Sequence, residues 1–475
     1  MRPTLFVPVE NQVRELDAKL LFACVAARHG YPVVLGRKQL LYFALPRFAP
    51  GIFIAKSMRA RSKLMFDIAR GLGHEVVAWD EESLVRFDSP EYFTWRFSPA
   101  TFNAISHLFA WGEDDAAMFA AYPGNRGVHI HATGNPRLDL LRAPLRPLFA
   151  AECAALRERH GDYILVNTNF SFVNPFVRMN ALVPPKRRFG RRRSRTAFGL
   201  SEDFAAGMAA HQQQLFDHFR VLLPALAERF PGRTIVLRPH PSEDHDVWRR
   251  LLAGHPNLEV RHEGNVIPWL MSAAVLVHNG CTTAVEGAVV GCPAVSYRPV
   301  RSATFDYALP NGLSHQADSV DDVLEAVAGI VERGLPAVSD ATRQHLFQRH
   351  LAAADGPLAA ERIVRTLDQF DIRPPGAGML ERSVTRLKCD ARTAIKRINM
   401  RRQGHWASDS YGRHVFPGVT LAALEQRVAV LGALLGAAGD VAVEACGDSV
   451  FRIAARGAGG PGARTEADPK VPLAR

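Results

Sequence analysis

Residues 275–287 read Val-Leu-Val-His-Asn-Gly-Cys-Thr-Thr-Ala-Val-Glu-Gly. A short apolar run leads through a turn of small residues into a helical pattern. This strand–turn–helix unit is the building block of parallel α/β sheets. Its turn presents free backbone N–H groups and the positive end of a helix dipole, which together favour an anion. No Walker lysine accompanies it, so the turn does not indicate an ATPase.

The same alternation of strand and helix extends in both directions from this unit. In the second half we expect strands at 163–167, 234–238, 258–261, 274–278 and 293–297, with helices at 201–230, 282–290 and 320–333. In the first half we expect strands at 4–9, 31–35, 51–55, 75–79, 107–111 and 127–133, with helices at 13–29 and 61–71. Two such units predict an α/β protein with two facing Rossmann-like domains and ligands at the carboxyl ends of the strands.

The predicted organisation has four parts. Residues 1–150 and 151–340 form the two Rossmann-like domains, 341–455 form a helical C-terminal extension, and 456–475 form a disordered tail rich in Gly, Ala and Pro.

Composition bounds the class of protein. The 475 residues carry 58 Lys plus Arg against 47 Asp plus Glu, a net charge of +11, with 47% apolar residues, which is a globular balance. No apolar run reaches the ~18 residues of a membrane-spanning helix, and the start is too short for a signal peptide. The six cysteines include no Cys-x-x-Cys pair, so we expect unlinked thiols and no metal site. A soluble cytoplasmic protein is the expectation.

Positive charge is concentrated in two stretches. Lys186–Arg195 holds seven basic residues in ten, and a second basic stretch runs from Arg382 to Arg402. Such stretches attract phosphates of anionic lipids, glycans or nucleic acids, although a solvated loop explains the first equally well. No recognition helix, zinc finger or aromatic–basic motif accompanies them, so we expect no specific nucleic-acid binding. Lys186–Arg195 is the candidate contact with an anionic membrane.

A phosphate site is predicted where two strands of the second half end. Arg238-Pro239-His240-Pro241 closes one strand, and its prolines restrict where His240 points. A guanidinium and an imidazole there suit a phosphate, although His240 could instead cap the turn. The second strand end contributes His278, Asn279, Gly280, Thr282 and Thr283. Thr282 could also merely cap the following helix.

Further polar residues lie at neighbouring strand ends. Glu286 could hold a ribose hydroxyl or could be a surface residue. The other ligand-binding candidates are Asn167, Thr168, Asn169 and Ser171 after one strand, and Lys56 after another. A turn stabilised by side-chain caps is the alternative for the Asn/Thr/Ser group.

Carboxylates of the first half are the candidate general bases. Asp80-Glu81-Glu82 ends a strand, and like charges in a cleft can raise a carboxyl pKa into a useful range. Glu15 and Asp17 lie near the first strand–helix turn. A solvated acidic turn is the alternative for the triplet, and helix N-terminal acids that complement the dipole are the alternative for the pair.

Taken together, these motifs resemble bacterial surface-carbohydrate biosynthesis proteins with the two-domain GT-B glycosyltransferase fold. The resemblance covers about residues 5–314 and rests on residues 14–19, 80–82, 133–139, 167–171, 238–241, 278–283 and 309–311. More distantly, the chain looks like bacterial sialyltransferases and capsule ketosyltransferases that use CMP-activated sugars. That likeness implies that His240 holds the CMP phosphate with Thr282 and Thr283, and that Glu81 or Glu82 is the base. Ser83 departs from the pattern, because those families have Gly there.

The implied activity is a metal-independent transfer of a sugar, such as a CMP-linked sialic-acid-like sugar or Kdo, to a glycan or lipid-linked glycan in capsule or lipopolysaccharide synthesis. The nucleotide sugar is a substrate, and no cofactor is expected. The alternatives are a non-hydrolysing UDP-sugar 2-epimerase, a polymerase that uses a CDP donor, and a catalytically silent capsule-assembly subunit.

Overall fold

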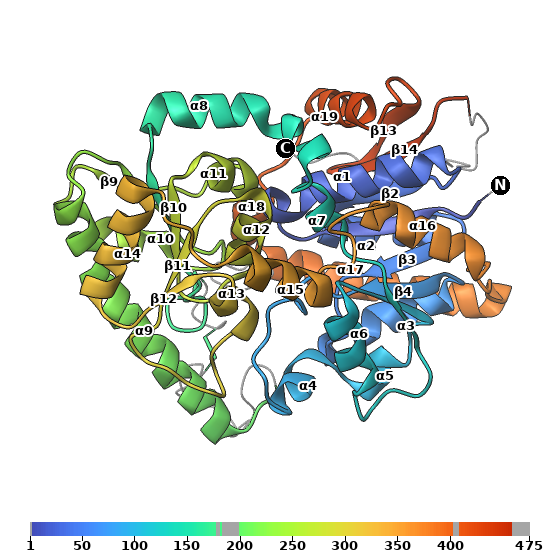
Figure 1. Ribbon diagram of the computed structural model, residues 1–475. Helices are drawn as coiled ribbons and strands as arrows, with labels where there is room; N and C mark the ends of the chain where they lie inside the picture. The colour runs from blue at the N-terminus through green and yellow to red at the C-terminus, as the bar shows by residue number, and fades with distance from the viewer. Residues whose placement is uncertain (1, 177–180, 183–198, 402–407, 458–475) are drawn as a thin grey trace.

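The computed structural model describes residues 2–176, 181–182, 199–401 and 408–457. Two α/β halves lie side by side, each built around one sheet (Figure 1). The predicted Lys186–Arg195 stretch and nearly all of the predicted tail, 456–475, lie outside the described residues.

The first sheet has eight strands in the order β13-β14-β2-β1-β3-β4-β5-β6. Its parallel strands are β1 Leu5–Val9, β2 Val33–Arg37, β3 Ile52–Ala55, β4 Glu75–Trp79, β5 His107–Ala110 and β6 His129–Ala132. Every residue of β1 is buried, because both faces of the sheet are covered. Leu5 and Val7 pack into the core on one face and Phe6 into the core on the other.

Helices cover the two faces of this sheet unequally. They are α1 Gln12–Arg28, α2 Lys38–Ala44, α3 Lys63–Gly71, α4 Glu91–Arg96, α5 Pro99–Phe102, α6 Glu113–Ala120 and α7 Pro136–Asp139, with short 3-10 turns at Leu45–Arg47, Ala60–Ser62 and Ala143–Phe149. Buried residues of α1 and α7 share the core that contains Leu5, whereas those of α2, α3, α4 and α5 share the core that contains Phe6.

The second sheet is entirely parallel, in the order β12-β11-β10-β7-β8-β9. Its strands are β7 Ile164–Asn167, β8 Ile235–Arg238, β9 Leu258–Val260, β10 Val275–His278, β11 Ala294–Tyr297 and β12 His315–Ala317. Its helices are α8 Ala150–His160, α9 Glu202–Arg229, α10 His245–Leu251, α11 Val266–Ser272, α12 Thr282–Val290, α13 Ala308–Gly312 and α14 Val320–Arg333. The α/β class and the two Rossmann-like sheets are confirmed.

The C-terminal extension is only partly helical. Its helices are α15 Asp340–His350, α16 Ala359–Gln369, α17 Met379–Met400, α18 Asp409–Val415 and α19 Leu421–Leu434. The prediction is wrong for 441–455, where β13 Val441–Gly447 and β14 Val450–Ala455 form a hairpin. Strand β14 pairs antiparallel with β2, so the hairpin covers what would otherwise be an open edge of the first sheet. Gly36 of β2 lies against the carbonyl of Ser449, where a Cβ would clash.

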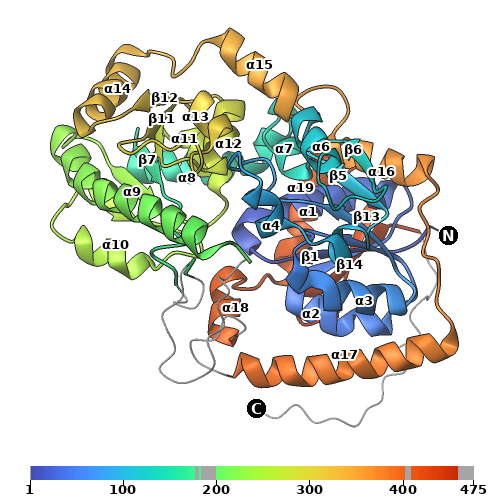
Figure 2. The same cartoon turned by 90° about the horizontal axis from the view of Figure 1, so that it is seen from below.

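The extension packs on the first half. Helix α16 contacts α1 and α7, α19 contacts α1, and α17 contacts α3 and α2. Figure 2 shows α17 along the outer edge of the first half, beyond α2 and α3. We propose that domain boundaries lie near residues 150 and 340 and that the extension returns to the first domain. Within the described residues, no helix combines the length and the apolar character that crossing a membrane requires.

Candidate functional site

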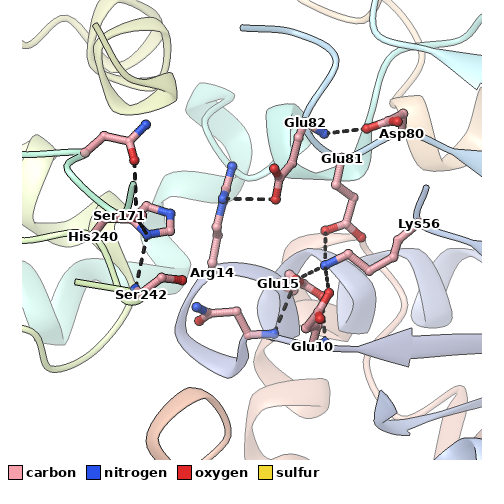
Figure 3. Close-up of polar contacts among 12 residues, drawn as sticks. Glu10, Arg14, Glu15, Lys56, Asp80, Glu81, Glu82, Ser171, His240 and Ser242 are labelled. Carbon is pink, nitrogen blue, oxygen red and sulfur yellow. Dashed lines mark hydrogen bonds and ion pairs between the residues drawn. The ribbon is translucent and has the colours of Figure 1, made fainter. Parts of the chain in front are cut away.

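Loops from the carboxyl ends of both sheets meet between the two halves. Figure 3 shows Glu10, Arg14, Glu15, Lys56 and residues 80–82 on the side of the first half, and Ser171, His240 and Ser242 on the side of the second. Arg14 lies between His240 and Glu82 (Figure 3). The predicted meeting of strand ends therefore brings Lys56, Glu82, Ser171 and His240 to one place.

A buried cluster of charged side chains lies on the first half's side of the candidate site. Glu15 accepts the backbone N–H groups of Glu10 at 2.9 Å and Asn11 at 3.2 Å, at the start of α1. Its carboxylate also contacts Lys19 Nζ at 2.6 Å and Lys56 Nζ at 2.7 Å. Burial opposes its ionisation, but the two ammonium groups outweigh burial and lower the pKa of Glu15 to about 2. A carboxylate so strongly stabilised is a weak base, and Glu15 serves to hold the turn.

Two members of the acidic triplet are likewise held by the protein. Asp80 is fully buried, pairs with Arg96 and accepts the backbone N–H of Glu82 at 3.0 Å. Glu81 is buried, accepts Trp79 Nε1–H at 3.1 Å and pairs with Lys19 at 2.7 Å. Neither side chain is open to an acceptor.

Glu82 is the member of the triplet that reaches the cleft. Its side chain is 47% exposed and lies 3.7 Å from the guanidinium of Arg14 and 3.5 Å from that of Arg96. Partial desolvation in the cleft opposes ionisation, yet Arg14 and Arg96 lower its pKa below the usual range. Glu82 is therefore ionised, and its basicity depends on where Arg14 is engaged.

Ser83 does not disturb this turn. It is fully buried, and its hydroxyl donates to Asp115 Oδ2 at 2.8 Å. Its φ is not positive, so the backbone does not require glycine here. The departure from the resembled families is accommodated by a local hydrogen bond.

Asp17 does not face the cleft cluster. Its carboxylate accepts Arg427 Nε–H at 2.9 Å and Asn265 Nδ2–H at 2.9 Å. These contacts join α1, the extension and the second half, so the geometry favours a structural role over that of a base.

His240 is held rigidly on the side of the second half. The backbone N–H of Ser242 lies 3.1 Å from its Nδ1, and the hydroxyl of Ser171 lies 3.0 Å from the same atom. A backbone N–H can only donate, so Nδ1 is the acceptor and the proton of the neutral ring is on Nε2. Burial and the charge of Arg14 lower the pKa of His240 to about 4. The ring therefore offers one neutral N–H donor.

A residue that sequence reasoning missed, Glu243, organises this loop. Its side chain is fully buried and accepts hydrogen bonds from the backbone N–H groups of Phe170 and His240, both at 3.0 Å. It also accepts from Thr168 Oγ1 at 2.9 Å and Trp248 Nε1 at 3.0 Å. Burial raises the pKa of Glu243 despite these bonds. Its position three residues after the histidine of the His-Pro motif was the only sequence signal.

The loop after β7 is mostly occupied by its own contacts. Thr168 bonds to Glu243, and the backbone N–H of Asn169 donates to Asn279 Oδ1 at 2.9 Å. Asn167 is buried, with an Oδ1 that finds no hydrogen-bond partner. The contact with His240 makes Ser171 the member that reaches the cleft group.

The loop after β10 is shaped by a buried histidine. His278 accepts the backbone N–H of Gly280 at 2.9 Å through Nδ1 and bonds to Ser314 Oγ at 2.8 Å through Nε2. Burial lowers the pKa of His278 to about 3, so this ring is neutral and structural rather than a phosphate ligand. Gly280 has φ +83°, and a Cβ there would lie 3.0 Å from the ring of Tyr307. Asn279, Gly280 and Tyr307 line a small pocket with Asn311.

Helix α12 begins at Thr282, as predicted, and points its N-terminus toward this loop. Thr282 and Thr283 are partly exposed there. Glu286, one turn later, is buried and pairs with Arg137 of the first half. Arg137 lies in residues 133–139, one of the stretches on which the resemblance rests, but its ion pair with Glu286 could not be predicted from the sequence. Glu286 therefore links the two halves rather than standing at the surface.

The guanidinium of Arg238 is held by groups of the protein itself. It is buried, donates to the carbonyls of Glu263 at 2.7 Å and Gly264 at 3.1 Å, and lies over the ring of Trp269 at 4.7 Å. Burial lowers its pKa to about 10, which leaves it charged at neutral pH. In this structure the guanidinium holds the loop after β9, and the expected contact with phosphate stays a prediction.

Three histidines near the His-Pro loop could hold a metal ion. One ring nitrogen each of His245, His262 and His414 lies within 4.8 Å of the others. His245 Nε2 and His414 Nε2 already lie 3.1 Å and 2.6 Å from the carbonyls of His240 and Pro241. These contacts give the rings a structural role beside His240.

Known proteins that are similar to this chain are found among the solved structures. No protein-family model matches the chain, and no curated protein matches it. Solved structures that are similar include the UDP-GlcNAc 2-epimerase of Neisseria meningitidis bound to UDP-GlcNAc, with 12% identity, a TM-score of 0.49 and coverage of 78% of this chain and 100% of that one. The UDP-GlcNAc 2-epimerase of Methanocaldococcus jannaschii has 12% identity and a TM-score of 0.48, and the match covers 78% of this chain and 100% of that one.

The wall teichoic acid polymerase TagF, as a variant with CDPG, is similar at 9% identity and a TM-score of 0.48, over 77% of this chain and 88% of that one. Likeness at these values carries neither substrate nor reaction over to this chain.

Proposed function

We propose that this protein is a glycosyltransferase that moves a sugar from a nucleotide donor to a glycan hydroxyl in surface-polysaccharide synthesis. The observation that carries the proposal is the facing pair of His240 and Glu82, with the charged Arg14 between them. One side offers a neutral donor for phosphate, and the other offers an ionised carboxylate for a hydroxyl.

The second half is the proposed donor side. His240 Nε2–H and the N-terminus of α12 would hold the phosphate, because a hydrogen-bond donor and the helix dipole both favour an anion there, and Ser171 would orient the His240 ring. A CMP-linked ulosonic acid is our first choice of donor, since its additional carboxylate suits the cationic Arg14.

Arg14 couples donor binding to the base in this proposal. In the free protein Arg14 is the strongest of the charges that lower the pKa of Glu82. When an anionic donor engages Arg14, Glu82 loses part of that stabilisation and its pKa rises. Glu82 then takes the proton from the acceptor hydroxyl as the oxygen forms its bond to the anomeric carbon. The bond from that carbon to the phosphate oxygen breaks, and CMP leaves with the electron pair.

The acceptor would be a glycan or lipid-linked glycan at the cytoplasmic face of the inner membrane. Lys186–Arg195 is the proposed contact with anionic membrane from the sequence. The donor is consumed as a substrate, and neither cofactor nor metal is required by the steps above.

The first experiment is thermal unfolding of the full chain with CMP, CDP, UMP, UDP and GDP. A ligand at ~100 times its Kd adds about 2.7 kcal/mol of stability. We expect stabilisation by CMP that is lost in His240→Ala and kept in His345→Ala, an exposed histidine on α15.

An assay of sugar transfer from CMP-activated donors then distinguishes nucleotide binding from catalysis. We expect Glu82→Gln to keep the stabilisation by CMP but to lose transfer, and Glu113→Gln, an exposed glutamate on α6, to keep both. Stabilisation by UDP alone, with epimerisation of a UDP-sugar in the absence of acceptor, would replace this proposal by the epimerase. No response to any nucleotide would replace it by the silent assembly subunit.

A further inference from the structure

Helix α17 turns an apolar face away from the protein. Its aliphatic stripe consists of five residues spaced by three, four or eight positions, Leu380, Val384, Leu387, Ile395 and Ile398, with the exposed Ala391 in the gap. Residues at this spacing share one face of a helix. Their side chains are 44% to 80% exposed. A surface helix normally buries its apolar face, so a stripe left exposed by the described residues is typical of an interaction surface.

The opposite face of α17 docks on the first half through small and polar side chains. Thr385 packs against Gly71 of α3, where a Cβ would come to 2.5 Å from the Thr385 hydroxyl. Cys389 Sγ lies 3.9 Å from the carbonyl oxygen of Tyr42. The guanidinium of Arg392 lies over the ring of Tyr42, 5.5 Å from its centroid. These contacts hold the aliphatic stripe outward, along the edge seen in Figure 2.

Basic side chains flank the stripe. The 22 residues of α17 contain six Lys or Arg and two acidic residues, a net charge of +4. At 100° per residue, the exposed Arg386 and Arg397 fall on one side of the stripe and the exposed Lys388 on the other, whereas Arg392 lies on the docked side over the ring of Tyr42. Arg386 and Arg397 also contact the carbonyl of Pro46 and the ring of Phe43 from the rim of the docked face. An apolar face between two basic flanks is the pattern of a helix that lies in the headgroup region of an anionic bilayer.

We propose that α17 binds the surface of a bilayer that contains anionic lipids. The five aliphatic side chains enter the boundary of the acyl chains, and the flanking guanidinium and ammonium groups contact lipid phosphates. Self-association through the same face is disfavoured, because it would oppose two helices of charge +4. This inference stands on α17 alone and does not depend on the proposed function.

Co-sedimentation of the full chain with vesicles tests it. We expect binding to phosphatidylcholine vesicles that include phosphatidylglycerol, and much weaker binding to phosphatidylcholine alone. Leu387→Glu/Ile395→Glu should lower the ratio of bound to free protein at least roughly tenfold, since burying one large aliphatic side chain changes an equilibrium constant by about that factor. The matched control is Val221→Glu, which alters a 61% exposed valine of α9 and should bind as wild type.

Charge is tested separately by Arg386→Glu/Lys388→Glu/Arg397→Glu, which should abolish the preference for anionic vesicles. Unchanged thermal unfolding will show that these exposed substitutions leave the fold intact. The proposal is overturned if the wild type does not bind, or if Leu387→Glu/Ile395→Glu binds equally well. It is also overturned if only neutralisation of Lys186–Arg195 removes binding, or if light scattering finds a dimer that Leu387→Glu dissolves without any vesicle binding.

Discussion

The ion pair between Arg137 and Glu286 should be a principal link between the two halves of the protein. Arg137 belongs to α7 of the first half and Glu286 to α12 of the second, and their side chains are only 7% and 9% exposed. We consider the change Arg137→Ala, which removes the cation and leaves the carboxylate in place.

The magnitude follows from what Glu286 keeps after the change. Its Oε2 is buried without a hydrogen-bond partner already, and Oε1 bonds to Arg137. Without Arg137 both oxygens of a buried carboxylate lack a partner, which costs about 3–5 kcal/mol. The variant also loses the contact of Arg137 with the ring of Trp111 at 5.7 Å. Replacing both partners, as in Arg137→Met/Glu286→Leu, should be roughly neutral because no charge is then stranded.

Urea unfolding followed by tryptophan fluorescence measures the effect. We expect Arg137→Ala to lower the free energy of unfolding by about 3–5 kcal/mol and the double variant to recover most of it. Because the pair joins the halves, Arg137→Ala should also separate one transition into two. A loss under about 1 kcal/mol, or single and double variants whose effects simply add, would show that the pair does not couple the halves.

Three further predictions concern the loops and the pH dependence. Glu243→Ala removes the acceptor shared by Phe170, His240, Thr168 and Trp248. At about 1 kcal/mol per hydrogen bond, the substitution should lower the free energy of unfolding by roughly 3–4 kcal/mol and weaken stabilisation by nucleotide. A loss of stability with full nucleotide binding would contradict the positioning role of Glu243. Gly280→Ala should destabilise the chain by about 1–2 kcal/mol in thermal unfolding, because φ +83° and the ring of Tyr307 both oppose a Cβ; Gly232→Ala, where nothing lies within 4 Å, is the control. His74 and His278 are buried, and burial lowers their pKa values to about 4 and about 3. In the unfolded chain a histidine has a pKa of about 6.5, so below that pH the unfolded state binds more protons than the folded state. Stability should therefore fall as pH drops from 6.5 towards 4, by up to about 1.4 kcal/mol per pH unit for each histidine, and His278→Asn should reduce that slope.

The parallel strands and their helices were predictable from the sequence. Strands such as β1 and β10 are buried on both faces, so they appear as continuous apolar runs, and each is followed by its own helix signal. The start of α12 at Thr282 was predictable for the same local reason. The hairpin β13–β14 was missed, because its pairing with β2 joins residues more than 400 positions apart.

The candidate site was only partly predictable. Its place followed from topology, because residues after parallel strands gather at one edge. Topology did not show which of those residues are free to bind a ligand. Arg238, His278 and Glu15 have the residue types of a site, yet the protein itself occupies them with carbonyls, backbone N–H groups and lysines.

Local signals along the chain were enough to specify the α/β class, the location of the strand ends and the polar residues that follow them, because periodicity and turn chemistry act between near neighbours. The packing of the folded chain was needed to establish that Glu82 rather than Asp80 or Glu81 reaches the cleft, that Glu286 bonds to Arg137, and that α17 faces outward. Burial and ion pairing are set by distances between residues far apart in the chain, and these distances exist only after the halves have packed.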